Sequence, residues 1–316
     1  MSEHKSICLV IIYNHNYEGN IEKLERIYTD RFKHIYHIIP FYSGQQKNVI
    51  PVYGNSYYFS SYVAQAYIVL RNIEVDSFLF IADDLILAPR LNEDNLYAEL
   101  KLDFDSAFIP DLRSLSRDRV YWPHARRLIK WNQSPKGLEL KGQFPLPEIL
   151  KSKFEKMLGE DVSILPTDVM FPKPTRSEFH RKGRGFKKIF KWFLLTCIYL
   201  ISRLYKKNRR LPYPFVRSYS DIFLIPRHTL SRFSHFCGLF AATELFAEIA
   251  IPTSLAIVHS KVKSESEIGK HGLAIWPHDL VNLGFSSKFN KSLTSLLNEF
   301  PEDLLYVHPI KLSEWD

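Results

Sequence analysis

The sequence predicts an α/β fold with a mostly parallel central sheet, and two observations lead to this fold class. Residues 6–13 form a continuous apolar run rich in β-branched side chains, as expected for a strand that is buried on both faces of a sheet. In residues 21–32 the apolar side chains recur instead at helical spacing. Strand-like and helix-like segments continue to alternate as far as residue 110, which indicates β-α-β units and parallel strands.

The remaining elements follow from the same two periodicities. An apolar stripe at Phe59, Tyr62, Val63, Tyr67 and Leu70 predicts a helix over residues 58–70, and a shorter helix is expected at 92–100. Further strands are expected at residues 34–41, 49–52, 77–82, 107–110, 222–226 and 254–258. Residues 111–175 contain many prolines and aromatic side chains and predict an irregular region, to which we assign no chemistry.

Two adjacent acids, Asp83 and Asp84, end the predicted strand at 77–82, in the run S-F-L-F-I-A-D-D-L-I-L-A-P. Desolvating unpaired charge is costly, so these carboxylates should face a crevice rather than the core. Open α/β sheets bind ligands at the carboxyl ends of their strands, and an acidic pair there suits a hard divalent cation that carries phosphates. The alternative is that the two acids only begin a turn or cap a helix, because Asp is common in both places.

Several function classes are not supported by the sequence. There is no G-x-G-x-x-G after the first strand and no G-x-x-x-x-G-K-[ST], so neither a dinucleotide fingerprint nor a P-loop is indicated. Cys8, Cys197 and Cys237 are too few and too irregularly spaced for a disulfide framework or a zinc site, which favours a reducing compartment. The N-terminal residues lead directly into a strand without a signal-peptide pattern, so we expect a cytoplasmic chain of one large domain or two.

The net charge of +8 comes from one segment. No acid occurs between His180 and Arg210, whereas eleven basic residues do: Arg181, Lys182, Arg184, Lys187, Lys188, Lys191, Arg203, Lys206, Lys207, Arg209 and Arg210. Without these eleven, acidic residues slightly outnumber basic ones in the rest of the chain.

An apolar stretch at residues 192–201, W-F-L-L-T-C-I-Y-L-I, lies within this basic segment. It is shorter than the roughly 20 apolar residues that span a bilayer. An apolar run flanked by Lys and Arg is typical of a helix lying in an anionic membrane interface. Two alternatives remain: a core helix whose lysines extend to solvent, and a nucleic-acid surface on which aromatic side chains stack bases. Nucleic acid is the less favoured partner, because the centre of the run carries no charge.

The order of elements in the first 110 residues resembles a GT-A glycosyltransferase, the Rossmann-like fold that uses nucleotide sugars. The run F-L-F-I-A-D-D-L-I-L resembles that fold's Asp-X-Asp segment, although Ala82 stands where the first acid would be if Asp84 is the last. The resemblance implies that Asp83 and Asp84 bind a divalent cation, Mn²⁺ or Mg²⁺, on the donor's diphosphate. It also implies nucleoside contacts at Tyr13, Asn14 and His15. The helix with Ser61, Ala64 and Gln65 resembles the one that packs under the donor site.

The C-terminal part contains a second acidic segment, in which Glu244 and Glu248 lie four residues apart on the helix expected from Thr243. It resembles the GT-A segment whose carboxylate faces the acceptor, and this implies that Glu244 is the general base, with Glu248 as its substitute. The alternative for each acid is that it has no catalytic role and only complements the helix dipole.

Residues on either side of this segment complete the expected site. Tyr219 and Asp221, just before the strand at 222–226, are expected on the acceptor side, with Asp221 as a further candidate base. The resemblance also implies that a C-terminal histidine completes the cation site and that a lysine contacts the diphosphate. We assign these roles to His259 and Lys261, with His271 and His278 as alternative histidines.

The resemblance implies a glycosyltransferase of the type that builds bacterial surface polysaccharides, and the basic segment predicts that it is peripheral on the inner face of the cell membrane. It would move a sugar from a nucleotide donor to a lipid-linked or polysaccharide acceptor. We expect a nucleotide-sugar half at 1–110, an acceptor-side region at 111–176, a basic amphipathic segment at 177–212 and a catalytic half at 213–316. The alternative is a non-catalytic protein that binds membranes or nucleic acid through its basic segment.

Overall fold

The structure is a computed structural model, which describes residues 5–118, 122–140, 142–170, 186–204, 209–275 and 283–315. The chain forms two compact units. Unit 1 combines Met1–Leu112 with Ser218–Asp316, and unit 2 is Arg113–Arg217. The predicted irregular region and the basic segment lie almost wholly in unit 2.

A seven-stranded sheet forms the centre of unit 1, in the order β12-β6-β11-β4-β1-β2-β3. Its strands are β1 (Ile7–Ile12), β2 (His34–Pro40), β3 (Val49–Val52), β4 (Ser77–Ala82), β6 (Ala107–Phe108), β11 (Ile222–Pro226) and β12 (Val262–Lys263). Only β11 runs antiparallel to its neighbours, β4 and β6. The α/β class and the mostly parallel sheet are therefore confirmed, and the architecture is compatible with a Rossmann-like fold.

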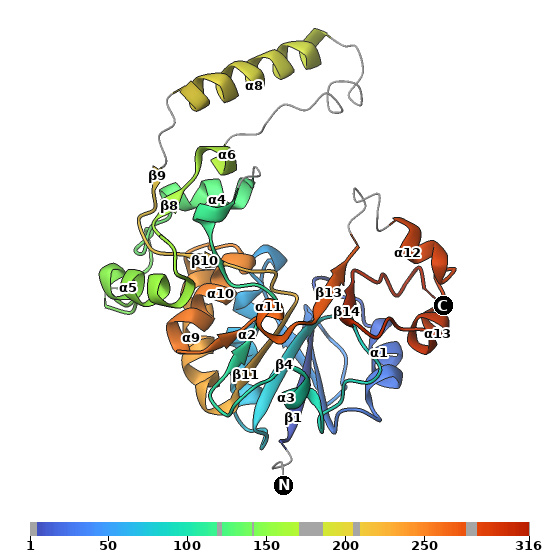
Figure 1. The fold of residues 1–316 in the computed structure, drawn as a ribbon. Helices are drawn as coiled ribbons and strands as arrows, with labels where there is room; N and C mark the ends of the chain where they lie inside the picture. The colour runs from blue at the N-terminus through green and yellow to red at the C-terminus, as the bar shows by residue number, and fades with distance from the viewer. Residues whose placement is uncertain are drawn as a thin grey trace. The chain divides into compact units, whose positions relative to one another are not determined.

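Both faces of this sheet are buried, as the run of residues 6–13 predicted. Successive side chains of β1 alternate between two apolar clusters, so that Cys8 and Val10 belong to one and Leu9 and Ile11 to the other. The helices α2 (Ser60–Leu70), α9 (Leu230–Ala242) and α10 (Ala247–Val258) cover the first face. Helix α1 (Asn20–Tyr28) covers the second face, together with the strands described next (Figure 1).

A second, three-stranded sheet lies against the α1 face, in the order β13-β14-β5. Its strands are β13 (His271–Ala274), β14 (Leu304–His308) and β5 (Ile86–Leu87). The remaining α-helices of unit 1 are α3 (Leu96–Glu99), α11 (Glu265–Ile268), α12 (Leu283–Lys288) and α13 (Leu293–Asn298). Because β5 directly follows the two acids, its pairing with β14 brings the C-terminal part of the chain next to them.

The predicted strand at residues 254–258 is wrong, because these residues belong to α10. Nearly every side chain of α10 is buried, and an apolar run without periodicity does not distinguish a buried helix from a buried strand. The helix begins at Ala247 rather than at Thr243. Glu244 lies in the preceding loop, with its backbone in the left-handed region at φ 57°.

Unit 2 has short elements around a small aromatic core. Trp131 contacts the rings of Phe144, Tyr213 and Phe215, and Arg217 is ion-paired with Asp118. The helices among its described residues are α4 (Pro123–Arg127), α5 (Pro147–Leu158), α6 (Thr167–Met170) and α8 (Phe186–Leu204). Two strand pairs complete the unit, β7 (Arg113–Ser114) with β10 (Val216–Arg217) and β8 (Ile164–Leu165) with β9 (Arg209–Arg210).

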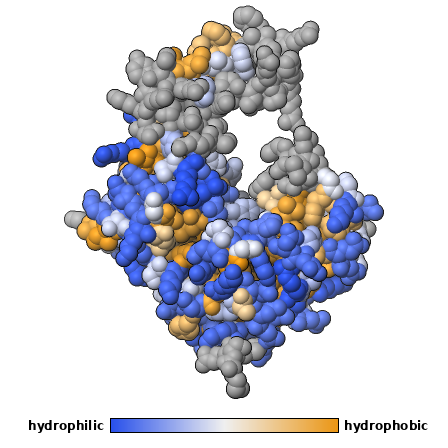
Figure 2. Space-filling view, in the orientation of Figure 1, coloured by the Kyte–Doolittle hydropathy of each residue, from blue (hydrophilic) through white to orange (hydrophobic). Residues whose placement is uncertain are grey.

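Helix α8 contains the apolar stretch of the basic segment. Among its described side chains, those of Phe190, Phe193, Leu194, Ile198, Leu200 and Ile201 are large, apolar and exposed. Figure 2 shows apolar colour on the described part of this helix. Among the residues that the structure describes, no helix is both long enough and apolar enough to cross a bilayer.

Candidate functional site

The acids Asp83 and Asp84 follow β4 at the carboxyl end of the parallel strands. The Asp83 amide donates to the carbonyl of Ile12 at 3.0 Å, which extends the pairing of β4 with β1. On the other side of β4, the Ala82 amide donates to the carbonyl of Asp221 at 2.8 Å. Because β11 is antiparallel, the residues that precede it lie at this same edge of the sheet.

Asp83 is held in place by its neighbours and is only 4% exposed. Asn20, the first residue of α1, donates from Nδ2 to Asp83 Oδ2 at 3.0 Å, and the backbone of Asn14 provides another hydrogen bond. Burial, together with the charge of Asp84, raises the pKa of Asp83 to about 7. A carboxyl group in this state gains from any cation that is brought next to it.

Asp84 pairs with His308, the last residue of β14, with 3.0 Å between Oδ1 and Nε2. Nδ1 of the same ring shares a hydrogen bond with the hydroxyl of Tyr219. Burial alone would lower the pKa of His308, but the hydrogen bond that its ring donates to Asp84 and the charges of Asp221, Asp84 and Asp83 raise it overall. The imidazole therefore has a partner at each of its two nitrogens.

Tyr219 packs against a second tyrosine, Tyr306. Its ring lies parallel to that of Tyr306, with 6.3 Å between the centroids, and the Tyr306 hydroxyl donates to Glu265 Oε1 at 2.8 Å. These contacts fix the ring that orients His308.

Two further carboxylates complete the charge distribution. Burial raises the pKa of Asp221, and the charge of Asp84 acts in the same direction, whereas His308 lowers it. Glu248, in the first turn of α10, accepts a hydrogen bond at its backbone carbonyl from the Ser218 amide at 3.1 Å. Its charge is among those that raise the pKa of Tyr219, after the larger effect of burial. Asp83, Asp84, Asp221 and Glu248 thus lie around His308 at this edge.

This arrangement can provide part of a cation site. No group of three or more His, Cys, Asp or Glu side chains lies close enough to hold a metal ion within the described ranges. Asp84 and His308 nevertheless converge on each other, and Mg²⁺ or Mn²⁺ commonly takes one or two protein ligands with the rest from phosphate and water. A small pocket at the same edge is lined in part by Asn14, Ser220 and Asp221.

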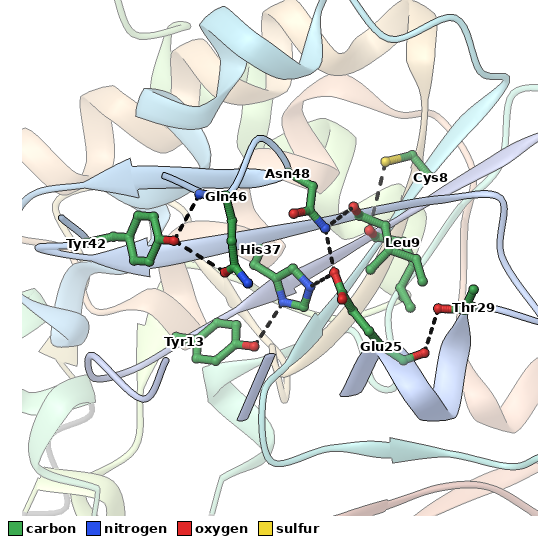
Figure 3. A network of polar contacts seen from close by, with 10 residues as sticks. Cys8, Leu9, Tyr13, Glu25, Thr29, His37, Tyr42, Gln46 and Asn48 are labelled. Carbon is green, nitrogen blue, oxygen red and sulfur yellow. Dashed lines mark hydrogen bonds and ion pairs between the residues drawn. The ribbon is translucent and has the colours of Figure 1, made fainter. Parts of the chain in front are cut away.

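Tyr13 is a core residue, although the sequence suggested that it contacts a ligand. Its side chain is fully buried, and its hydroxyl is 2.9 Å from Nδ1 of His37 on β2 (Figure 3). On the other side of the ring, Nε2 of His37 lies 3.5 Å from Glu25 on α1, which also accepts a hydrogen bond from Asn48. Asn14 and His15 remain at the carboxyl edge, the first half-buried and the second exposed.

The buried His37 predicts a pH-dependent stability. Burial lowers its pKa from 6.5 to about 4, although Glu25 acts in the opposite direction. The folded state favours the neutral ring. The contribution of this ring to the free energy of unfolding is therefore complete above pH 6.5 and is lost as the pH falls from 6.5 to 4. Its size should be about 1–3 kcal/mol.

Urea unfolding at several pH values measures this slope. Relative to wild type, His37→Gln should show a smaller fall in the free energy of unfolding between pH 6.5 and 4. The exposed His235→Gln should retain the wild-type slope. An unchanged slope in His37→Gln would contradict the role of His37.

The predicted His259 and Lys261 do not join the acids. Both precede β12, which runs in the same direction as β4, so they lie at the opposite edge of the sheet. Lys261 is ion-paired there with Asp103 at 3.0 Å, and His259 is buried at the end of α10. A cation site shared by these residues and Asp83 is therefore wrong on topological grounds.

The other predicted residues are also placed by the topology. Glu244 is exposed in its loop, whereas Glu248 lies on the site's side of α10. His271 begins β13 at the end opposite His308 and is 3.9 Å from Asp303. The alternative His278 lies outside the described residues.

Sequence reasoning missed His308. The run L-L-Y-V-H-P repeats the pattern of the A-D-D segment, an apolar strand that ends in a group able to bind a metal ion. What the pattern does not reveal is that β14 pairs with β5 and so ends beside Asp84, where the Ile310 amide donates to the Asp84 carbonyl at 2.6 Å.

Exposed aromatic rings extend the edge beyond the acids. Phe41, directly after β2, is 60% exposed and has a left-handed backbone with φ 55°, which is unusual for a bulky side chain. Its ring contacts the exposed Tyr53, directly after β3, with 5.8 Å between the centroids. Tyr17 and Tyr57 are also largely exposed. Backbone strain that presents an apolar ring to solvent is typical of ligand sites.

Comparisons with known proteins do not assign the chain to a family. None of the protein-family models matches it, and no curated protein matches it either.

Proposed function

We propose that the protein is a glycosyltransferase of the GT-A type, which binds a nucleotide-sugar donor at the carboxyl edge of its large sheet. The observation that carries the proposal is the pairing of Asp84 with His308 inside a group of four carboxylates. An edge this acidic repels a bare diphosphate, so a diphosphate can bind there only together with a divalent cation.

Each residue has a role in this proposal. Asp84 and His308 would hold the cation, and Asn20 keeps the neighbouring carboxylate of Asp83 in place. When bound, the cation supplies positive charge that stabilises the departing diphosphate. The Tyr219 hydroxyl is hydrogen-bonded to Nδ1 of His308 and so orients the imidazole. Proteins commonly fix metal-binding histidines through a hydrogen bond at the nitrogen that does not bind the metal.

Asp221 is the best-placed general base. Asp221 is among the residues that line the small pocket of this edge, and its raised pKa makes its carboxylate a stronger base toward an acceptor hydroxyl. Accepting the proton of that hydroxyl lets the oxygen form its bond to the anomeric carbon as the diphosphate leaves. In this assignment Glu248 contributes negative charge near the site and does not accept the proton.

The aromatic edge fits the base of the nucleotide. The rings of Phe41 and Tyr53 follow strands β2 and β3, on the side of β1 away from β11. Stacking of a base on an aromatic ring contributes about 1–3 kcal/mol. A donor lying along this edge would place its base at these rings and its diphosphate near Asp84.

Thermal unfolding with a panel of nucleotide sugars tests donor binding. In the presence of Mn²⁺, the correct donor at a hundred times its dissociation constant should add about 2.7 kcal/mol of stability. The increase should vanish with EDTA. A panel that covers the common nucleotides and sugars and gives no cation-dependent increase would contradict the proposal.

The second part of the proposal is that α8 holds the enzyme on the anionic inner face of a cell membrane, where it meets a lipid-linked or polysaccharide acceptor. The support is the row of exposed apolar side chains on α8 between the clusters of Lys and Arg in residues 181–210. Apolar side chains insert below the lipid headgroups, and the basic side chains are attracted to the negative charge of these headgroups.

Co-sedimentation with anionic liposomes should therefore have two components. The electrostatic component should weaken as salt rises, because screening acts within about 10 Å at 0.1 M ionic strength. The double variant Phe193→Ser and Leu194→Ser should lose the salt-resistant component. As a matched control, the double variant Leu146→Ser and Ile149→Ser removes two exposed apolar side chains outside α8 and should bind like wild type. Failure of the wild-type protein to sediment with the liposomes would contradict the membrane proposal.

A further inference from the structure

Unit 1 has a second cavity, at the opposite edge of the large sheet from the acids. Its volume is about 350 Å³, within the range of small-molecule sites. Helix α2 contributes Tyr67 and the residue that follows the helix contributes Arg71, while Arg227 and His228 come from the short turn after β11. The sheet register places Pro226 beside Ser77, the first residue of β4, which fixes the cavity at the amino end of β4.

Two arginines give the cavity its charge. Arg71 has no ion pair among the described residues, and its guanidinium carbon lies 5.8 Å from the centroid of the Tyr67 ring. Arg227 donates to the carbonyl of Arg71 at 3.5 Å and to Glu74 at 2.7 Å. Glu74 is 84% exposed, so this pair is weak and open to exchange with another anion.

The acid in the lining is already engaged. One oxygen of Asp76, Oδ2, accepts hydrogen bonds from both the amide and the hydroxyl of Ser6, at 2.8 and 3.0 Å. Asp76 therefore does not neutralise the arginines by direct pairing in this structure.

Flat apolar surface lies beside these charges. The ring of Phe104 is stacked on His228, with 5.1 Å between the centroids and 10° between the planes, and Phe104 is 56% exposed. Tyr67 adds a second ring to the lining, next to Arg71.

We propose that this cavity is a second binding site, for a small organic anion that carries a flat ring. Arginine matches the planar oxygen pair of a carboxylate or phosphate, and its guanidinium is more weakly hydrated than an ammonium group. The rings of Tyr67 and Phe104 supply contact for the body of such a ligand. Unlike the acidic edge, this site has its own cations and needs no metal, so it binds independently of the donor.

Titration calorimetry of the full chain in EDTA, with phenyl phosphate as the probe, tests the site. Inorganic phosphate and phenol are the matched controls, since each has half of the probe. Phenyl phosphate should bind more tightly than either, and Arg71→Gln should weaken it about tenfold or more. Arg232→Gln removes an exposed arginine of α9 that does not line the cavity, and should bind the probe like wild type.

The outcomes separate this site from the donor site. Asp84→Asn should leave phenyl phosphate binding unchanged, whether or not the donor proposal holds. Equal affinity for phenyl phosphate and inorganic phosphate, or unchanged affinity in both Arg71→Gln and Arg227→Gln, would overturn the proposal. Ring resonances of Phe104 and His228 in the wild-type protein give an independent reading by NMR, because they should shift during the same titration.

Discussion

Replacing Asp84 with asparagine should lower the turnover of the nucleotide sugar by about a hundredfold or more and leave the protein folded. The substitution preserves the shape of the side chain but removes the charge that faces His308 and the cation. Turnover of the donor found by thermal unfolding provides the measurement. His308→Asn should have a similar effect, because it removes the other member of the pair.

The matched control is Asp30→Asn, the same change at an exposed position on unit 1, which should have wild-type turnover. Wild-type turnover in Asp84→Asn would contradict the cation site. If Asp83→Asn is instead the more damaging change, Asp83 is the principal ligand and Asp84 serves to position His308.

The second large effect is expected at Asp221. If this carboxylate removes the acceptor's proton, Asp221→Asn should lower the catalytic rate by a factor of about 10² to 10⁴, with donor affinity intact. Glu248→Gln should have a much smaller effect, and the exposed Glu244→Gln should have none. The comparison requires steady-state rates with saturating donor and a separate measurement of donor binding. A ranking in which Glu248→Gln is the most damaging would move the base to α10.

Much of the fold of unit 1 follows from local pattern in the sequence. Strands β1, β2, β3 and β4 are short, mainly apolar runs, and helix α2 has a clear apolar stripe. Whether an element is buried on one face or on both determines the spacing of its apolar side chains, and this spacing can be read from the sequence. The same reasoning failed at α10, because a helix that is buried all round has no periodicity left to read.

The composition of the site was less predictable than the position of its acids. That Asp83 and Asp84 follow a central strand can be read from one segment. That His308 faces Asp84 depends on the pairing of β14 with β5, two strands separated by more than 200 residues. His259 was assigned to the cation site because it follows a predicted strand at residues 254–258. These residues form the end of α10 instead, so the reason for the assignment does not hold. Tyr13 was misjudged because its hydroxyl finds a buried partner in His37, which no local pattern reveals.

The most direct test of the central claim is the release of nucleoside diphosphate from nucleotide sugars by the purified full-length chain. We predict that at least one nucleotide sugar releases its diphosphate in the presence of Mn²⁺, faster when a glycan acceptor is added. This release should be lost in EDTA and in both Asp84→Asn and His308→Asn. If the wild-type protein neither binds nor cleaves any nucleotide sugar with Mn²⁺ or Mg²⁺, the carboxyl edge is not a glycosyl-transfer site.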